Sequence, residues 1–263
     1  MTQAAADSVL VARDGPIATV TLNNPARRNA LTKGAWRRLA EVMEELDAED
    51  DLRCVVVRGA GDEAFAAGAD ISEFETERAN AAQATAYAEV VRRAVKALRE
   101  IRHITIAMVQ GACTGGGLEI ACCLDLRLGG HSARLGVPIN RLGNVLAYPE
   151  LDVVLRLAGE PVVLEMLLEG RIFNAEESHA RGLLNRIYPD AELAAETQAA
   201  ARRIADGAPL AARQHKYMLR RLRDPAPITE AEMAACRAVC DSDDYREGFR
   251  AFLAKEKPRF TGR

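Results

Sequence analysis

Long apolar runs are absent from this sequence. No stretch approaches the roughly 20 consecutive apolar residues that cross a bilayer, and the first residues, MTQAAADSVL, lack the charged start and apolar core of a secretory signal. We therefore expect no membrane partner and a cytoplasmic location. An excess of positive charge is also missing, because 35 lysines and arginines are matched by 38 aspartates and glutamates. Without a basic stripe, we expect no nucleic-acid partner.

Paired cysteine motifs and histidine clusters are missing as well. The chain has 6 cysteines and 4 histidines, and no two cysteines have the CxxC spacing. Cys236 and Cys240 lie four apart on a predicted helix, which is half of a metal clip, but no histidine or second pair accompanies them. We therefore expect reduced thiols and no metal site.

What the sequence contains is the alternation of an α/β protein. SVLVARDGPIATVTL (8–22) predicts two strands joined by an Asp-Gly turn. Thr32 is placed to cap a helix whose apolar positions recur with helical spacing. Further strands are predicted at 53–58, at 104–109 and over LDLRLGG (124–130), and further helices from about 75 to 102 and from 116 to 123.

This repeated order of strand, turn and helix favours a parallel sheet with crossover helices. The strands at 53–58 and 104–109 are about 50 residues apart, which leaves two arrangements open, a coiled β-β-α solenoid and a doubly wound sheet. Beyond residue 150 the pattern turns mainly helical, RDPAP (223–227) is the clearest linker, and residues 229–255 predict a final helical pair. The 263 residues suffice for one large domain, with or without a helical appendage.

One segment, CTGGGLEIACC (113–123), combines three glycines with a glutamate in an apolar run. A strand that ends in glycines and opens a helix leaves amide N–H groups unpaired at the positive end of the helix dipole. Such a place binds phosphate or stabilises an oxyanion. The segment matches neither GxGxxG nor GxxxxGK[ST], so it gives little support to dinucleotide binding.

Glu119 favours the oxyanion interpretation. It follows Gly116 by three residues, so the amide and the carboxylate share one helix face. A carboxylate among apolar neighbours should have a raised pKa, which suits proton transfer near neutrality. FAAGADISEF (65–74) again follows a strand, and Ala69 is positioned to supply a second amide donor. The alternative is a glutamate that is stabilised at a helix N-terminus and reaches solvent.

Four segments together resemble the enoyl-CoA hydratase/isomerase family, also called the crotonase superfamily. They are NNPARRNAL (23–31), AFAAGADISEF (64–74), VQGACTGGGLEIACCLDLRL (109–128) and GFRAFLAKEKPRF (248–260). The resemblance implies an α/β fold, with a crotonase-like spiral of β-β-α turns over residues 1–200. A helical C-terminal trimerisation region over residues 201–263 would follow, in a homotrimer or homohexamer.

The resemblance also implies a substrate and a set of site residues. The substrate would be an acyl-CoA thioester, met in fatty-acid or related acyl-CoA degradation, and no separate cofactor is expected because coenzyme A is part of that substrate. The catalytic set would be the amides of Ala69 and Gly116, which hold the thioester oxygen, and Glu119 as acid/base. The coenzyme A moiety would contact Ala66, Asp70 and Ile71, while Arg27, Arg28 and Lys257 would contact its phosphates or remain solvated surface charges.

The sequence departs from the family at its second catalytic glutamate. LGVPINRLG (135–143) keeps the surrounding glycines and proline, but Ile139 occupies the glutamate position. Three functions therefore remain open: a hydratase or related lyase that uses Glu119, an acyl-CoA-binding protein without that chemistry, and a nucleotide-binding α/β protein. Tyr148 and Glu150, in the next loop, are expected either to supply an acid or to pack and start a helix. His131 is expected to be structural or exposed.

Overall fold

A computed structural model describes residues 7–263, and its strands form two sheets. The larger sheet has the order β1 (Val9–Asp14), β2 (Ile17–Leu22), β3 (Cys54–Gly59), β5 (Ile104–Val109), β7 (Leu126–Gly130) and β10 (Arg186–Tyr188). Only β1 and β2 pair antiparallel in it. The smaller sheet has the order β4 (Ala64–Ala66), β6 (Ala112–Thr114), β8 (Arg134–Gly136) and β9 (Ile172–Phe173).

Helices are interspersed with the strands along the chain. Those of the body are α2 (Lys33–Asp47), α3 (Phe74–Glu77), α4 (Ala81–Glu100), α5 (Gly116–Cys123), α6 (Tyr148–Ala158), α7 (Glu160–Leu164), α8 (Ala175–Ala180) and α9 (Asp190–Ala205). Short helical turns are η1 (Pro25–Arg27), η2 (Ile71–Glu73), η3 (Ile139–Leu142), the π-helical η4 (Glu165–Glu169) and η5 (Val239–Asp241).

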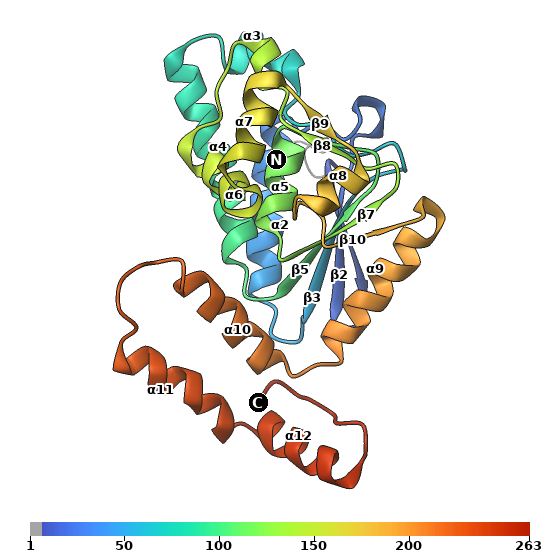
Figure 1. The fold of residues 1–263 in the computed structure, drawn as a ribbon, viewed down its shortest axis with the longest axis vertical. Helices are drawn as coiled ribbons and strands as arrows, with labels where there is room; N and C mark the ends of the chain where they lie inside the picture. The colour runs from blue at the N-terminus through green and yellow to red at the C-terminus, as the bar shows by residue number, and fades with distance from the viewer. Residues whose placement is uncertain (1–6) are drawn as a thin grey trace.

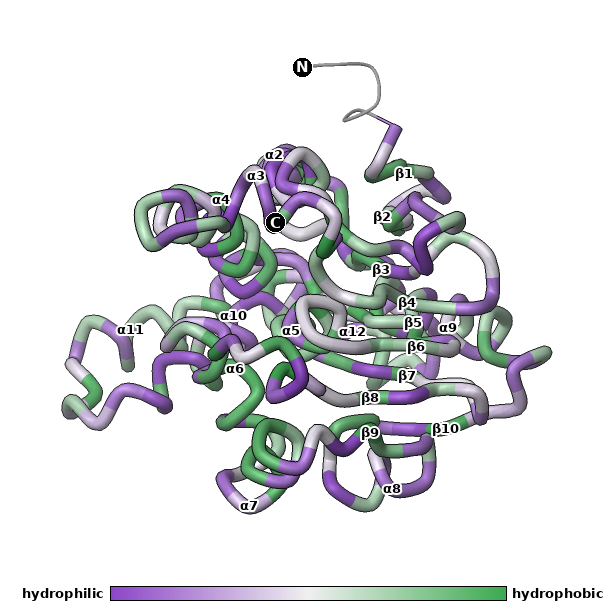
Figure 2. Tube along the Cα trace, turned by 90° about the horizontal axis from the view of Figure 1, so that it is seen from above, coloured by the Kyte–Doolittle hydropathy of each residue, from purple (hydrophilic) through white to green (hydrophobic). Residues whose placement is uncertain are grey.

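The chain climbs through successive β-β-α turns, which confirms the predicted spiral and excludes a single doubly wound sheet. One turn runs through β3, β4 and α4, the next through β5, β6 and α5, and the third through β7, β8 and α6. Figure 2 shows these turns following one another from β3 to β8. The spacing of about 50 residues holds only between β3 and β5, because α5 has 8 residues whereas α4 has 20.

Local chemistry explains the first elements. Gly15 takes a φ of 57° in the turn between β1 and β2, a conformation that favours glycine. The Thr32 side chain accepts a hydrogen bond from the Ala35 amide and so caps α2, as the sequence predicts. The buried face of α2, which includes Trp36 and Leu39, packs against α4.

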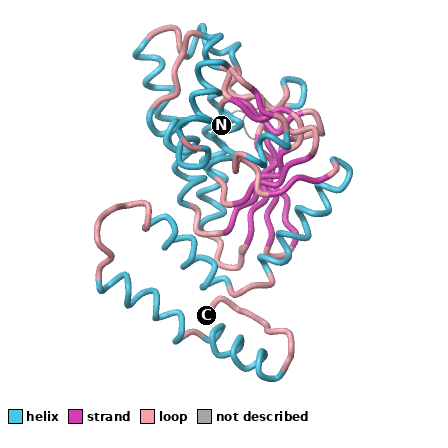
Figure 3. Tube along the Cα trace, in the orientation of Figure 1, coloured by secondary structure: helices cyan, strands magenta, loops and turns pink. Residues whose placement is uncertain are grey.

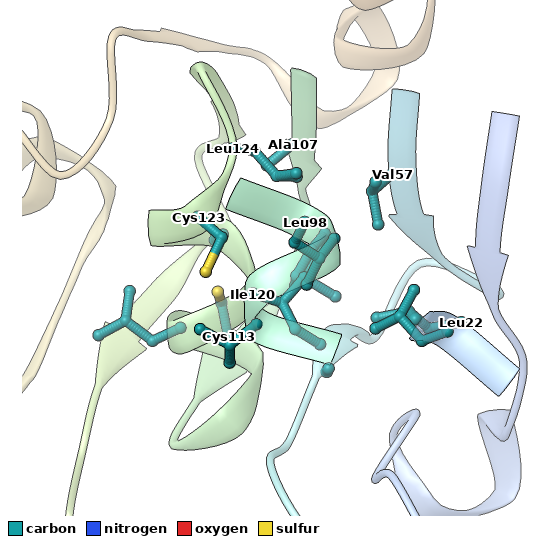
Figure 4. Close-up of a cluster of buried hydrophobic side chains, with 14 of the residues drawn as sticks. Leu22, Val57, Leu98, Ala107, Cys113, Ile120, Cys123 and Leu124 are labelled. Carbon is teal, nitrogen blue, oxygen red and sulfur yellow. The ribbon is translucent and has the colours of Figure 1, made fainter. Parts of the chain in front are cut away.

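The larger sheet is covered on both faces, which is why its strands are almost continuously apolar. Helices α2, α4, α5 and α6 lie on one side and α9 on the other (Figure 1, Figure 3). Val57 of β3 joins the cluster under α4 and α5, whereas its neighbour Val56 packs toward α9. Figure 4 shows Leu22 and Val57 from the sheet near Leu98 of α4 and Ile120 of α5, all of them buried.

The C-terminal helices extend away from this body. They are α10 (Pro209–Arg221), α11 (Glu230–Ala238) and α12 (Asp243–Ala254), and α11 and α12 lie beyond α10, far from the strands (Figure 1). The buried Lys216 anchors α10, because its Nζ donates to an Asp125 oxygen at 2.6 Å and to the His103 carbonyl at 2.5 Å. The boundary proposed at residue 200 lies within α9 and remains a prediction. None of the helices in residues 7–263 is long and apolar enough to span a bilayer.

Candidate active site

A cavity of about 240 Å³ opens where the spiral brings several segments together. It is lined by the segment after β4, the start of α5, the segment from β8 into α6, and residues of α2 and α4. Most of its wall is apolar, with contributions from Trp36, Ile71, Phe74, Val91, Ile139 and Leu142. The two motifs that the sequence singled out, FAAGADISEF and CTGGGLE, therefore meet in one place.

The three consecutive glycines each have a separate structural reason. Gly115 takes a φ of 51°, a left-handed value that side chains disfavour. A Cβ on Gly116 would lie 2.7 Å from the ring of Trp36, and one on Gly117 would lie 2.1 Å from the Ala66 carbonyl oxygen. Both distances are far below van der Waals contact, so the start of α5 approaches its neighbours as only glycine allows.

The backbone amides of Ala69 and Gly116 lie close together at the cavity. A Cβ on Gly68 would be 3.4 Å from the Gly116 nitrogen, and one on Gly116 would be 3.7 Å from the Ala69 nitrogen. Both residues line the cavity. Within residues 7–263 neither amide donates a hydrogen bond to another group. The arrangement presents two unused donors to whatever occupies the cavity.

The loop that bears Ala69 is held by the NNPARRNAL segment. The Leu31 amide donates to the Gly68 carbonyl at 2.8 Å, and the Asp70 amide donates to the Leu31 carbonyl at 2.8 Å. Buried Asn29 fixes this segment to β4, because its Nδ2 donates to the carbonyl of Ala64 at 2.8 Å. Sequence reasoning missed this role of Asn29, although its place in a recognised motif was a signal.

Glu119 is buried, with 5% of its surface exposed, and it lines the cavity from the first turn of α5. Its carboxylate accepts no hydrogen bond from residues 7–263. Burial, with a smaller contribution from the negative charge of Glu150 and against the opposing charge of Arg78, raises the pKa of Glu119 to about 8. The raised pKa predicted from the apolar neighbours is therefore confirmed, and the alternative of a solvent-reaching glutamate is not.

A second carboxylate and an apolar side chain also line the cavity. Glu150, in the first turn of α6, is 6% exposed and lines the cavity. Ile139 lines the cavity from η3 and packs against the core. The neighbouring Asn140 does not line the cavity, and its Nδ2 donates to the Leu168 carbonyl at 3.0 Å. The cavity thus has Ile139 at the position of the family's second catalytic glutamate, and it has a carboxylate, Glu150, at a different position.

Arg78, Tyr87 and Trp36 contribute further polar groups to the lining of the cavity. The Arg78 guanidinium lies 4.5 Å from the ring centre of Phe74 and 5.2 Å from that of Tyr87. Tyr87 and Trp36 are both buried and line the cavity. Sequence reasoning missed these roles. In the sequence Trp36 is simply one apolar position of the helix that Thr32 caps, and no sequence signal marked Arg78 or Tyr87.

Two of the predicted coenzyme A contacts have structural duties of their own. Ala66 is fully buried beneath Gly117, outside the cavity lining. Asp70 is 6% exposed and caps η2, accepting from the Ser72 amide at 3.0 Å. Burial acts to raise the pKa of Asp70, but hydrogen bonds from Ser72 and the charge of Arg27 bring the net pKa below its ordinary value. Ile71 lines the cavity and is 55% exposed, so it lies at the mouth.

The predicted basic contacts are distributed over two regions. Arg27 is near the site, because its Nη1 donates to Asp70 at 3.0 Å and to the Ser72 hydroxyl at 2.9 Å. Arg28 is exposed, and its carbonyl accepts from the Ala67 amide at 2.9 Å. Lys257 follows α12, is exposed, and pairs with Asp206 at 2.7 Å. It does not line the cavity of its own chain.

The other residues considered from sequence lie outside the cavity. His131 is exposed and its Nδ1 is 3.1 Å from a Glu176 oxygen, as expected of a structural or exposed histidine. Tyr148 begins α6 and is 89% exposed. Among residues 7–263, no group of three or more histidine, cysteine, aspartate or glutamate side chains is arranged to hold a metal ion.

Comparison with known proteins gives a consistent result. Residues 12–263 match the family described as enoyl-CoA hydratase/isomerase. The short-chain-enoyl-CoA hydratase of Clostridium acetobutylicum is 28% identical, over 95% of this chain and 96% of its own. The crotonyl-CoA hydratase of Syntrophomonas wolfei is 27% identical, over 98% of this chain and 99% of its own.

One solved structure shares the fold at higher identity. An enoyl-CoA hydratase/carnithine racemase from Magnetospirillum magneticum is 51% identical and superposes with a TM-score of 0.96, over 98% of this chain and 96% of that one. Near-complete coverage on both sides means that the spiral and the C-terminal helices belong to one shared architecture.

Proposed function

Because this chain belongs to the enoyl-CoA hydratase/isomerase family, we propose that it adds water to 2-enoyl-CoA thioesters or catalyses a closely related reaction of the thioester enolate. The observation that supports this most is the meeting of Glu119 with the unused amides of Ala69 and Gly116 in one largely apolar cavity. The two amides would hold the thioester oxygen, and Glu119 would move a proton at the neighbouring carbon.

The chemistry follows from what develops during the reaction. Electron density that shifts onto the thioester oxygen is stabilised by two fixed N–H donors, each of which is typically worth about a hundredfold to a thousandfold in rate. This shift makes the β-carbon of an enoyl group electrophilic and the α-carbon basic. Gly116 and Glu119 lie on one face of α5, with a rise of about 4.5 Å between them. Their spacing suits an oxygen and the carbon next to it.

The protonation state of Glu119 fits this role. With a pKa of about 8, the group is mostly protonated at neutral pH and is able to donate to the α-carbon. In the reverse direction its carboxylate accepts the same proton. Burial among apolar side chains keeps bulk water away from the enolate, and it also strengthens the two amide interactions.

We extend the proposal to the rest of the substrate and to the assembly. Ile71, at the mouth of the cavity, and Arg27, hydrogen-bonded to Asp70 beside Ile71, would contact the coenzyme A moiety. Exposed apolar side chains on the C-terminal helices, among them Phe249 and Phe252, are typical of an interface and favour the homotrimer or homohexamer. Lys257, which follows α12, would contact the phosphates of coenzyme A in this assembly. A cytoplasmic enzyme of acyl-CoA degradation fits these features.

A second function is favoured by Ile139 alone. With an apolar residue at the position where the family has its second glutamate, the chain would bind acyl-CoA esters through the same amides and turn none of them over. The two functions share a ligand and differ in chemistry, so a binding measurement by itself does not separate them.

The test is a panel of 2-enoyl-CoA esters from short to medium chain, scored for loss of the conjugated thioester absorbance and for binding. The proposed function predicts turnover, and Glu119→Gln should lower kcat by about 10²- to 10⁴-fold with the ester still bound. Glu169→Gln, an exposed glutamate of η4, serves as the control. Binding without turnover by the wild-type protein would instead establish the second function.

A further inference from the structure

Four α-helices within residues 7–263 have a glutamate at the third helical position: α6, α8, α9 and α11. In α9 this residue, Glu192, is exposed to solvent. In α8 and α11 the residues are Glu177 and Glu232. Each accepts a hydrogen bond from the backbone amide of its own N-cap residue, Asn174 or Thr229, in a reciprocal capping box. Both side chains are partly exposed and satisfied by these contacts.

Glu150 has the same position in α6 and makes no such contact. The N-cap residue of α6 is Ala147, and no side-chain cap is formed there. Glu150 is 6% exposed, and its Oε2 atom is buried with no hydrogen-bond partner among residues 7–263. An unpaired buried carboxylate oxygen destabilises a fold by at least about 1–3 kcal/mol. The helix-start role expected from sequence therefore does not account for this residue.

The groups around Glu150 indicate a role in the reaction rather than at the start of the helix. It lines the cavity that also holds Glu119 and the amides of Ala69 and Gly116. The negative charge of Glu150 contributes to the raised pKa of Glu119. The other ionisable side chains of this cavity are Arg78 and Tyr87. The position that the family resemblance assigned to a second carboxylate holds Ile139, which also lines the cavity.

We propose that Glu150 is the second acid/base of this site, supplied from the first turn of α6 in place of a carboxylate at position 139. The inference rests on the proposed function and deepens it. The cavity then contains two carboxyl groups with separate roles, Glu119 as the proton donor to the α-carbon and Glu150 as the acceptor of a proton from water.

In the hydration direction, water attacks the β-carbon while Glu150 accepts one of its protons. A carbon–oxygen bond forms at the β-carbon, an oxygen–hydrogen bond of water breaks, and the π electrons move through the α-carbon onto the thioester oxygen. The enolate then collapses, and the α-carbon takes the proton of Glu119. Glu150 ends protonated and Glu119 ionised, and return of that proton to Glu119 through solvent resets the pair.

The test compares Glu150→Gln with Glu177→Gln, which alters a glutamate at the same helical position outside the cavity. Three quantities are measured for each: the kcat of hydration, the Kd of a saturated acyl-CoA, and the exchange of α-protons of that ester in deuterated water. Exchange needs the enolate and Glu119 but no attacking water. Glu150→Gln should lower kcat at least about 100-fold with Kd and exchange within about threefold of wild type, and Glu177→Gln should change none of them.

Equal hydration by Glu150→Gln and wild type would overturn this inference and leave the proposed function intact. Loss of binding, exchange and hydration together would also overturn it, because that pattern indicates a structural role. Exchange without hydration in the wild-type protein would overturn this inference alone, whereas absence of both hydration and exchange would remove the proposed function and this inference with it. If Glu150→Gln does not fold, Glu150→Asp keeps the charge and withdraws the carboxylate, and it should lower kcat at least about tenfold while exchange is retained.

Discussion

Glu119 and Glu150 line one cavity from the first turns of two different helices, α5 and α6. Neither carboxyl group is part of an ion pair or a hydrogen bond within residues 7–263. Two buried carboxyl groups without fixed partners respond strongly to each other and to nearby charge. Several measurable properties depend on this relationship.

The first prediction concerns the pH dependence of hydration. If Glu119 is the proton donor, as proposed, its pKa of about 8 means that kcat should fall as pH rises through that value. Arg78 lowers the pKa of Glu119, so Arg78→Gln should move this fall to higher pH. Profiles of kcat between about pH 6 and 10 provide the measurement. A fall at the same pH in both proteins would show that Arg78 does not act on Glu119.

The second prediction concerns stability. The pKa of Glu119 is raised from an ordinary 4.5 to about 8 in the folded protein, so between these values the folded state binds more protons than the unfolded state. Its stabilising contribution is complete below the lower value and is lost as pH rises through the upper one. Glu119→Gln should therefore raise Tm relative to wild type at pH 8.5 by at least about 2 °C more than it does at pH 5. Equal Tm differences at the two pH values would contradict this.

The third prediction concerns the close approach of α5 to β4. Gly117→Ala places a methyl group 2.1 Å from the Ala66 carbonyl oxygen, so the start of α5 must shift. We expect a loss of about 1–3 kcal/mol in the free energy of unfolding and a fall in kcat of at least tenfold. Gly116→Ala clashes with the Trp36 ring at 2.7 Å instead. Because a ring is smaller in phenylalanine, adding Trp36→Phe should recover part of the stability lost in Gly116→Ala but none of that lost in Gly117→Ala.

The fourth prediction concerns Asp70. Its hydrogen bonds with Ser72 and Arg27 hold the loop next to Ala69, so Asp70→Ala should lower stability by about 1–2 kcal/mol and kcat together. The pKa of Asp70 is held below its ordinary 3.8, so the stability that its charge provides is present above that value and is lost as pH falls. Urea unfolding should accordingly show a smaller difference between variant and wild type near pH 3 than at pH 7. Exposed Asp241, changed to Ala, is the control.

The fifth prediction concerns Ile139. Introducing a carboxylate by Ile139→Glu would give the cavity a third acidic group, which repels the two already there. If Glu150 is the second acid/base, kcat should rise by no more than about twofold, and Tm at neutral pH should fall, whereas the uncharged Ile139→Gln should lower Tm less. A large gain in hydration by Ile139→Glu would mean instead that position 139 was the missing group.

Much of the fold was accessible from sequence because its signals are local. The Asp-Gly turn of β1 and β2, the Thr32 cap and the apolar run of β5 each depend on neighbouring residues, and all three are found as predicted. The smaller sheet was not predicted strand by strand. Its members β4, β6 and β8 have three residues each and include alanine and glycine, so their pairing depends on distant segments rather than on propensity.

The residues of the candidate site show the same contrast between local sequence signals and the packing of distant segments. Glu119, Gly116 and Ala69 were predicted because glycines and a lone glutamate stand out in an apolar sequence, and the structure places all three at one cavity. Glu150 was left with alternatives, because a glutamate in the first turn of a helix ordinarily reflects the helix dipole. Arg78 and Tyr87 had no distinguishing signal. Which residues line a cavity depends on how α3, α4 and α6 pack, and no short sequence window contains that information.

The donors at Ala69 and Gly116 have one more consequence, since every amino acid except proline supplies a main-chain N–H. Point mutation in a gene rarely deletes such a group, whereas a single codon change removes or adds a carboxylate. Evolution from a common ancestor would therefore preserve the two amide donors for the carbonyl oxygen, while acidic residues are lost from one helix and gained on another. New reactions would arise on this scaffold by moving acids, with the path of the chain left untouched.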